Sequence, residues 1–187
     1  IGRILALKIL SPAGPLEAVL GMEELERRFV AEAVTMARLH HPHVASVIGF
    51  GRHGGRPYYL QDFYDNHLGL VMGEGRPEEP SRILPLPRAA RYVGQLLEGL
   101  ARLHHAGIVH PDIKPPNLLL TPEDDPRIGG LGLSKIRGER FPTPPSLRVG
   151  TPWYAPPEQE RDPEAATPAA DLYAAGVVLY RLLTGRL

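Results

Sequence analysis

Hydrophobic residues in the first third of the chain follow two different repeats. Residues 3–10 are apolar on both faces apart from one lysine, which predicts a buried strand. Between 25 and 36, apolar side chains recur every three or four positions, as in an amphipathic helix. That helix should end near Pro42, because proline excludes the preceding residue from helical geometry. Short strands joined by a glycine turn are expected at 44–50 and 57–62.

The remaining chain indicates helices and small strand pairs. Residues 64–86 give no clear signal, whereas 87–107 carry one apolar helical face between an initial proline and a terminating glycine. Residues 108–133 alternate short apolar runs with turns, which predicts small strand pairs. An irregular, proline-rich stretch covers 138–163. The last helix, at 167–183, is apolar nearly all round and is therefore predicted to be buried.

This order of elements predicts an α+β fold, in which a strand–helix–strand portion and a mainly helical portion meet at a hinge near residue 63. The 187 residues suit one domain, and 43% hydrophobic residues is a globular composition. The chain opens on Ile1 rather than methionine, which favours a piece of a longer protein.

Composition and charge mainly exclude functions. The 21 basic and 21 acidic residues cancel, so nothing points to nucleic acid or to an anionic membrane. The absence of cysteine excludes disulfides, thiolate zinc sites and a cysteine nucleophile, and it fits a cytoplasmic protein. No apolar run approaches the roughly 20 residues that span a bilayer, and no signal peptide is recognisable.

Four segments carry the candidate chemistry. They are LALK at 5–8, IVHPDIKPPNLLL at 108–120, RIGGLGLSK at 127–135 and GTPWYAPPEQ at 150–159. In this order and at these separations they resemble the signature set of protein kinases, and the resemblance covers nearly the whole chain. It implies a bilobal kinase fold, with a partial small lobe and hinge at 1–63 and a partial large lobe at 64–187. It also implies ATP and Mg²⁺ as cofactors and a protein substrate or partner.

The first segment holds the candidate ATP-binding lysine. A lysine inside an apolar strand is costly to bury unpaired, so Lys8 needs an anionic partner. The resemblance implies that Lys8 holds the α- and β-phosphates of ATP and pairs with Glu32 on the next helix. Outside this motif order, Lys8 would be an edge-strand charge and Glu32 a solvated helix residue.

The second segment resembles the catalytic loop of the family. By resemblance, Asp112 orients the substrate hydroxyl or accepts its proton, Lys114 steadies the γ-phosphate, and Asn117 is a magnesium ligand. His110 would lie in the core beneath the loop. Pro111 occupies the position of an arginine that holds a phosphorylated activation loop in many kinases, so that mode of control is not expected here. The alternative interpretation is a turn rich in polar residues.

The third segment departs from the family pattern at the metal site. Gly130-Leu131-Gly132 stands where the family has Asp-Phe-Gly. Leu131 can fill the apolar position of the phenylalanine, but Gly130 offers no carboxylate, and magnesium usually takes one or two protein carboxylates beside the phosphates. Asn117 then remains as a neutral ligand. If the metal supplies several kcal/mol of transition-state stabilisation, its misplacement costs roughly a thousandfold in rate.

The fourth segment resembles the substrate-docking loop and the motif that follows it. By resemblance, Thr151 lies in that loop, and Asp171 anchors the backbone of the catalytic loop from the last helix. In the family, the glutamate at Glu158 meets an arginine of a later helix, so Glu158 is expected to be an orphan or simply solvent-exposed. Lys114 together with the docking segment favours serine/threonine over tyrosine substrates.

Two family features are expected to be missing, namely a glycine-rich loop before residue 5 and the helices that complete the large lobe after residue 187. Exposed apolar patches are therefore expected where those parts would pack. Histidines at 40–43 and 104–105 raise the alternative of a metal site, but they match connectors of the family and a site would also need convergent ligands.

Three hypotheses follow. The chain is a kinase-like domain impaired in catalysis, acting as a pseudokinase scaffold or as a module that binds a partner or a nucleotide. Alternatively, it is an active serine/threonine kinase in a complete parent protein, where another carboxylate holds the metal. Glu123, Asp124 and Asp125 are nearby in the sequence, but they fall in a turn that is expected to point away from the cleft. The third hypothesis is a decayed fragment that folds poorly.

Overall fold

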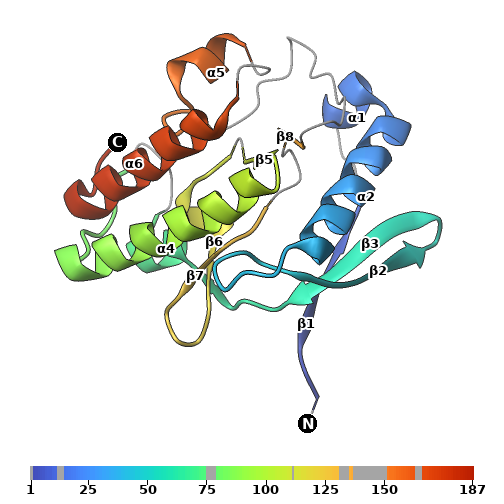
Figure 1. Ribbon diagram of the computed structural model, residues 1–187, viewed down its shortest axis with the longest axis horizontal. Helices are drawn as coiled ribbons and strands as arrows, with labels where there is room; N and C mark the ends of the chain where they lie inside the picture. The colour runs from blue at the N-terminus through green and yellow to red at the C-terminus, as the bar shows by residue number, and fades with distance from the viewer. Residues whose placement is uncertain are drawn as a thin grey trace.

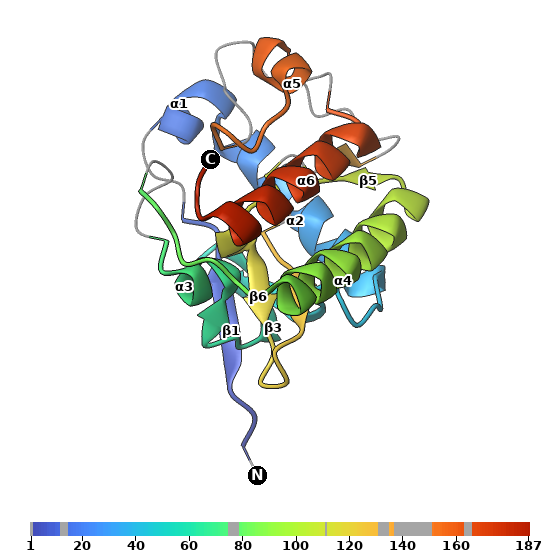
Figure 2. The same cartoon turned by 90° about the vertical axis from the view of Figure 1, so that its left-hand side faces the viewer.

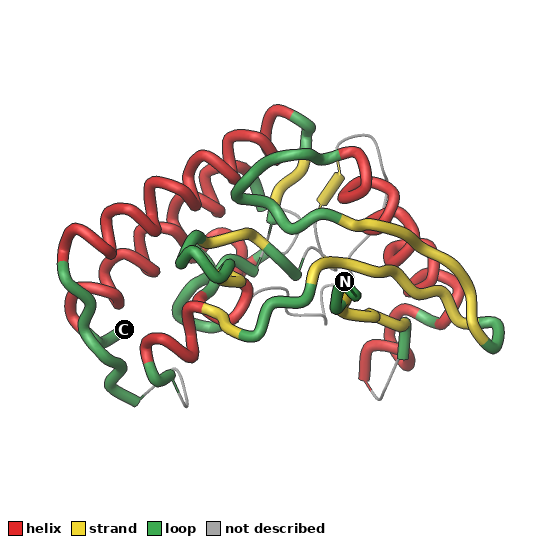
Figure 3. Tube along the Cα trace, turned by 90° about the horizontal axis from the view of Figure 1, so that it is seen from below, coloured by secondary structure: helices red, strands yellow, loops and turns green. Residues whose placement is uncertain are grey.

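A three-stranded sheet and its covering helix lie on one side of the molecule, and two long helices lie on the other (Figures 1 and 3). The computed structural model describes residues 2–11, 15–74, 79–110, 112–130, 135–136, 151–162 and 166–187. The helices are α1 (Pro15–Leu20), α2 (Met22–Arg38), α3 (Leu68–Met72), α4 (Leu86–His105), α5 (Pro157–Arg161) and α6 (Pro168–Thr184), with a 3₁₀ turn η1 (Pro115–Asn117). The strands are β1 (Leu5–Ile9), β2 (Val47–His53), β3 (Arg56–Asp62), β4 (Asn66–His67), β5 (Ile108–Val109), β6 (Leu118–Leu120), β7 (Pro126–Ile128) and β8 (Lys135–Ile136).

The first sheet is antiparallel in the order β1-β3-β2, and α2 packs against it. Gly54 and Gly55 form the β2–β3 turn with positive φ angles of 56° and 79°, which glycine adopts without steric cost. Tyr59 of β3 is fully buried and stacks against Phe29 of α2 with ring centroids 5.2 Å apart. The strands and the helix predicted for this part are confirmed.

Burial of β1 on both faces was predicted and is wrong. Leu7 is 59% exposed and Ile9 is 36% exposed. β1 lies at the edge of the described sheet and pairs with β3 alone. A helix covers a single face of this sheet in the part of the chain that the structure describes, so an apolar run in β1 does not imply burial on both sides.

The stretch without a sequence signal contains β4 and α3. The ring nitrogen Nδ1 of His67 caps α3 by accepting a hydrogen bond from the backbone N–H of Leu70 at 3.3 Å, and Gly73 ends the helix in the left-handed conformation. A five-residue helix is too short to show a 3.6-residue repeat, which explains the missing signal. The short helix α5 likewise interrupts the stretch interpreted as irregular.

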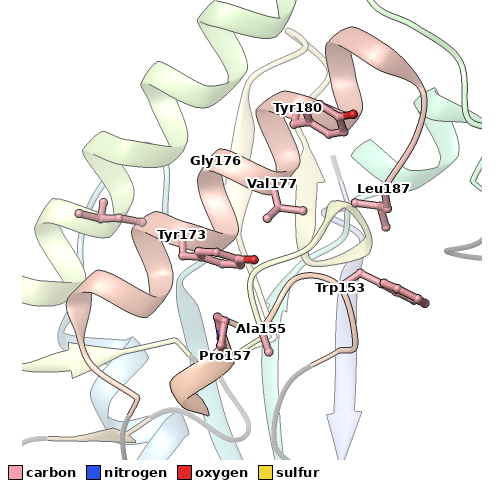
Figure 4. A pocket seen from close by; sticks show the side chains of 9 residues that line it. Trp153, Ala155, Pro157, Tyr173, Gly176, Val177, Tyr180 and Leu187 are labelled. Carbon is pink, nitrogen blue, oxygen red and sulfur yellow. The ribbon is translucent and has the colours of Figure 1, made fainter. Parts of the chain in front are cut away.

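The helices α4 and α6 lie side by side (Figure 2). The apolar face predicted for α4 is buried, whereas α6 is buried on one face only, which corrects the prediction for this helix. Leu172, Tyr173 and Tyr180 of α6 are 45–56% exposed. Together with Trp153 they line an apolar pocket of about 640 Å³ (Figure 4). Exposed apolar side chains thus gather on α6, in line with the expectation of exposed apolar patches.

Short strands before and after α4 in the sequence position the candidate site. Two further antiparallel sheets form, β4-β6-β7 and β5-β8, and the 3₁₀ turn η1 leads directly into β6. Of the strand pairs predicted for 108–133, the pair β6–β7 is confirmed, whereas β5 pairs with β8 beyond that range. The α+β class is confirmed as well, whereas the boundary near residue 63 stays a prediction. Among the described helices, none is long and apolar enough to cross a membrane.

Candidate active site

The sheet and α2 bring Lys8 and Glu32 together. Lys8 faces Tyr59 across the β1–β3 pair, and its Nζ lies 3.9 Å from Glu32 Oε1 and 5.3 Å from the centroid of the Tyr59 ring. The hydroxyl of Tyr59 donates a hydrogen bond to the same carboxylate oxygen at 3.2 Å. The Lys8 side chain is 46% exposed, while that of Glu32 is only 4% exposed. The ammonium group therefore remains accessible to a second anionic group.

Glu32 is held in an environment that penalises its charge. Burial raises the pKa of the Glu32 carboxyl above its ordinary value, and Lys8 and the hydroxyl of Tyr59 oppose that shift without cancelling it. Burial, and then the neighbouring Glu32, also raise the pKa of Tyr59. Functional sites typically contain such a buried carboxyl group with a shifted pKa beside a half-exposed lysine.

The raised pKa of Glu32 predicts a pH dependence of stability. A carboxyl with a higher pKa in the folded state contributes stability that is fully present below its unfolded value near 4.5 and is lost as the pH rises through the folded-state pKa. Glu32→Gln removes this loss, so its stability relative to wild type should rise with pH. Urea unfolding from about pH 4 to about pH 8 measures the difference. Glu158 is exposed, so the stability of Glu158→Gln should change with pH as that of wild type does. If the free energies of unfolding of Glu32→Gln and wild type change in parallel with pH, the account is contradicted.

A second cluster forms around Asp112. Lys114 Nζ lies 2.9 Å from Asp112 Oδ2 and donates a hydrogen bond to Thr151 Oγ1 at 2.6 Å. The hydroxyl of Thr151 donates in turn to Asp112 Oδ1 at 2.6 Å. The amide nitrogen of Asn117 donates to the carbonyl oxygen of Asp112 at 2.7 Å and to Oδ2 at 3.1 Å. Lysine, hydroxyl and amide groups thus fix the orientation of a carboxylate that could accept a proton.

Buried polar groups hold this loop from beneath. The backbone N–H of His110 donates to both oxygens of Asp171 at 3.2 and 3.0 Å, and His104 Nε2 donates to Asp171 Oδ2 at 2.7 Å. His110 Nε2 donates to the carbonyl oxygen of Gly129 at 2.9 Å, while its Nδ1 accepts from the N–H of Asp112 at 3.2 Å. The tautomer with a proton on Nε2 satisfies both contacts of His110. Asp171 therefore contacts the loop backbone as the resemblance implied.

The residues present do not fit a magnesium site. Gly130 has a φ of 75° and carries no carboxylate, and a Cβ there would lie 2.9 Å from Asn117 Oδ1. The nitrogen of the Asn117 amide is engaged by Asp112, whose carboxylate is itself engaged by Lys114 and Thr151. Over the described residues, no group of three or more histidine, aspartate or glutamate side chains could hold a metal ion. Asn117 offers only the neutral oxygen of its amide, whereas magnesium favours carboxylates.

The neighbouring acidic turn does not supply the missing carboxylate. Asp124 is held by Arg88 at 2.7 Å and by Arg91 at 2.6 Å, and Asp125 is held by Arg91 at 2.9 Å. These arginines lie on α4, and Asp124 also accepts from Tyr92, whose pKa is raised to about 12, first by burial and then by Asp124. Both aspartates thus form ion pairs with arginines of α4. This agrees with the expectation that the acidic turn points away from the cleft.

The other candidates have mixed outcomes. Pro111 and Leu131 lie outside the described residues, and Glu158 is exposed on α5. Both ring nitrogens of His43 have partners within the fold. Its Nδ1 lies 3.2 Å from the carbonyl oxygen of Pro126, and its Nε2 lies 3.5 Å from Glu98.

Sequence reasoning missed Tyr59, and it also missed a buried ion pair behind the docking segment. In that pair, Arg181 Nη1 of α6 lies 3.2 Å from Glu74 Oε1. An arginine inside the apolar stretch 174–183 is the signal that could have predicted a buried partner.

Comparison with known proteins identifies the family of this chain. A family model described as "Protein kinase domain" matches residues 2–187. The serine/threonine-protein kinase PknL of Mycobacterium tuberculosis is 32% identical over 186 residues, which are 99% of this chain and 44% of the relative. The serine/threonine-protein kinase pkn3 of Myxococcus xanthus is 33% identical over 197 residues, covering 100% of this chain and 34% of the relative.

A third relative, the serine/threonine-protein kinase PknA of Mycobacterium tuberculosis, is 34% identical over 192 residues, covering 100% of this chain and 42% of the relative. The chain thus spans less than half the length of these curated relatives. All four motif segments lie inside the region that the family model matches. The chain therefore belongs to the protein kinase family, and its relatives are bacterial serine/threonine kinases.

Proposed function

We propose that this chain is a serine/threonine-kinase-like domain whose magnesium-dependent phosphoryl transfer is strongly impaired. The single observation that carries the proposal is Gly130, which stands at the position of a metal-binding aspartate and leaves Asn117 as a neutral ligand. Electrostatic stabilisation and positioning account for most of phosphoryl-transfer catalysis, so the loss of the metal removes a large share of it. The domain then acts as a pseudokinase, which serves as a scaffold or binds a protein partner or a nucleotide.

The retained residues have the following proposed roles. Lys8, whose ammonium group is half exposed and anchored near Glu32, binds the phosphates of ATP. Asp112 receives the hydroxyl of a serine or threonine substrate, and Lys114 at 2.9 Å neutralises the transferred phosphate. Thr151 holds the docking segment on this pair. These contacts support recognition of a nucleotide and a hydroxyl group, even where transfer is slow.

A second candidate is a working serine/threonine kinase in a longer protein. Its support is the preserved pairing of Lys8 with Glu32 and of Asp112 with Lys114. This candidate needs a carboxylate from elsewhere, because Asp124 and Asp125 are bound to arginines of α4. Transfer by the longer protein with magnesium or manganese, absent in this chain, would favour it.

The proposal is tested by following transfer of labelled phosphate from ATP to a mixed protein substrate, with magnesium and with manganese. We expect the chain to give the same incorporation as its Asp112→Asn variant, because loss of the metal costs roughly a thousandfold or more. A cooperative melting transition of both proteins excludes poor folding as the cause. Robust transfer that Asp112→Asn abolishes would overturn the proposal.

A further inference from the structure

A fully buried arginine lies behind the docking segment. Arg181 of α6 has an exposed fraction of 0% and lies in the apolar stretch 174–183 of that helix. Its Nη1 lies 3.2 Å from Glu74 Oε1, and its Nη2 donates to the carbonyl oxygen of Glu79 at 3.2 Å. A buried charge is tolerated only with such compensation, so this arginine is bound to the chain around residue 74.

The same guanidinium group contacts Tyr154, which follows the candidate active-site residue Thr151 by one turn. Arg181 Nη1 donates to the Tyr154 hydroxyl at 3.3 Å, and that hydroxyl donates to Glu74 Oε1 at 3.4 Å. Tyr154 is 2% exposed, and burial, followed by Glu74, raises its pKa. The protonated hydroxyl therefore completes a three-membered cluster of Arg181, Glu74 and Tyr154, which we call the Arg181 cluster.

The segment between these anchors has an unusual backbone. Trp153 has a φ of 77°, a left-handed conformation that is a genuine outlier for a bulky side chain. A strained backbone of this kind persists only where contacts with the surrounding structure hold it in place. Thr151 is fixed by Asp112 and Lys114 on one side, and its carbonyl oxygen accepts from the N–H of Tyr154 at 3.1 Å. The Arg181 cluster provides the contact on the other side.

We propose that Arg181 is a positioning residue that acts through Tyr154. By binding the Tyr154 hydroxyl and Glu74, it holds residues 151–155 in the strained turn that places Thr151 on Asp112 and Lys114. The proposal rests on the proposed function only for the role of Asp112. The position of the segment can be measured without any phosphoryl transfer, so a failure of the proposed function leaves this test intact.

Trp153 provides the readout, because it is the single tryptophan of the chain and is 55% exposed beside the pocket on α6. Its emission, excited selectively, and its quenching by acrylamide are recorded well below the melting transition. Arg181→Met keeps an unbranched apolar stem and removes the guanidinium group with its charge and its hydrogen-bond donors. We expect a red shift and a larger quenching constant than in wild type, because the strained turn relaxes toward solvent.

Three companion variants make the test specific. Tyr154→Phe loses only the hydroxyl and should give a change in the same direction, and it keeps the proposal testable if Arg181→Met fails to fold. Arg181→Lys retains a positive charge on the side of Glu74 and should recover part of the wild-type emission. Arg91→Met removes an arginine that binds Asp124 and Asp125 instead, and should leave the emission of Trp153 unchanged.

The double variant Arg181→Met/Tyr154→Phe should change the Trp153 emission no more than the more strongly affected single variant does, because both substitutions remove the same contact. If Arg181 contributes only to global stability, the melting midpoint falls while the emission and quenching of the folded variants match wild type. That result in both Arg181→Met and Tyr154→Phe would overturn the proposal. Additive changes in the double variant would also overturn it, since the two residues would then act separately.

Discussion

Replacement of Asp171 by alanine is expected to destabilise the protein by about 3 kcal/mol, because it deletes a buried anchor of the backbone at His110. The Asp171 side chain has an exposed fraction of 0% and accepts hydrogen bonds from His104 and from the backbone N–H of His110. Without it, the buried N–H of His110 loses its acceptor inside the core, and the partly buried imidazole of His104 loses its partner. Urea unfolding followed by circular dichroism measures the loss.

Two variants define the control for this prediction. Asp171→Asn keeps an acceptor oxygen and should lose clearly less stability than Asp171→Ala. Glu158→Ala removes a carboxylate that is exposed on α5, and it should stay within about 0.5 kcal/mol of wild type. Equal losses for Asp171→Ala and Glu158→Ala would show that Asp171 does not anchor the loop.

A second large effect is expected at Gly99, in the middle of α4. A Cβ at this position would lie 2.7 Å from the carbonyl oxygen of His43 and 2.8 Å from Ile128 Cδ1. The helix therefore approaches the backbone before β2 more closely than any side chain permits. Overpacking costs about 2–3 kcal/mol, which outweighs the roughly 1 kcal/mol that alanine gains over glycine in a helix. Gly99→Ala should lose about 1.5 kcal/mol on balance.

The same helix offers the matched control. Gly94 is exposed, and a Cβ there meets nothing within 4 Å. Gly94→Ala should stabilise the protein by about 0.5–1 kcal/mol through helix propensity alone. The two substitutions thus have opposite expected signs, and thermal denaturation of both variants measures them. A gain in stability for Gly99→Ala would contradict the close approach of α4 to His43.

Elements with a strong repeat could be predicted from the sequence. The helix α4 and the β2–β3 hairpin show the spacing of apolar residues and glycines that such elements require. The pairing of Lys8 with Glu32 and the contacts of Asp112 with Lys114 could be predicted only because motif order placed these residues together. Periodicity alone contains no information on contacts between residues that are far apart in the chain.

Features that depend on tertiary surroundings could not be predicted. The exposure of Leu7 depends on what covers the sheet, and the one-sided burial of α6 depends on its neighbours rather than on its composition. The short helix α3 begins with a histidine cap, a rarer choice than serine or aspartate, and is too brief for a repeat. The left-handed backbone of Trp153 is likewise imposed by contacts at both ends of its segment.

We infer that one residue, Gly130, disables the metal site of this kinase-like domain. Its test needs two substitutions, because any side chain at this position meets a φ of 75° and the amide of Asn117. Gly130→Asp introduces the carboxylate, and aspartate tolerates this backbone region better than most residues. Gly130→Ala imposes the same Cβ without the carboxylate, so it is the matched control.

The most direct measurement is a thermal-shift titration of wild type, Gly130→Asp and Gly130→Ala with ATP, with and without magnesium. A ligand that binds only the folded state raises the melting midpoint, and at a hundredfold excess over its dissociation constant it contributes about 2.7 kcal/mol. We predict a magnesium-dependent rise for Gly130→Asp alone. An equal magnesium-dependent rise in wild type and Gly130→Asp would contradict the claim, because another group would then hold the metal.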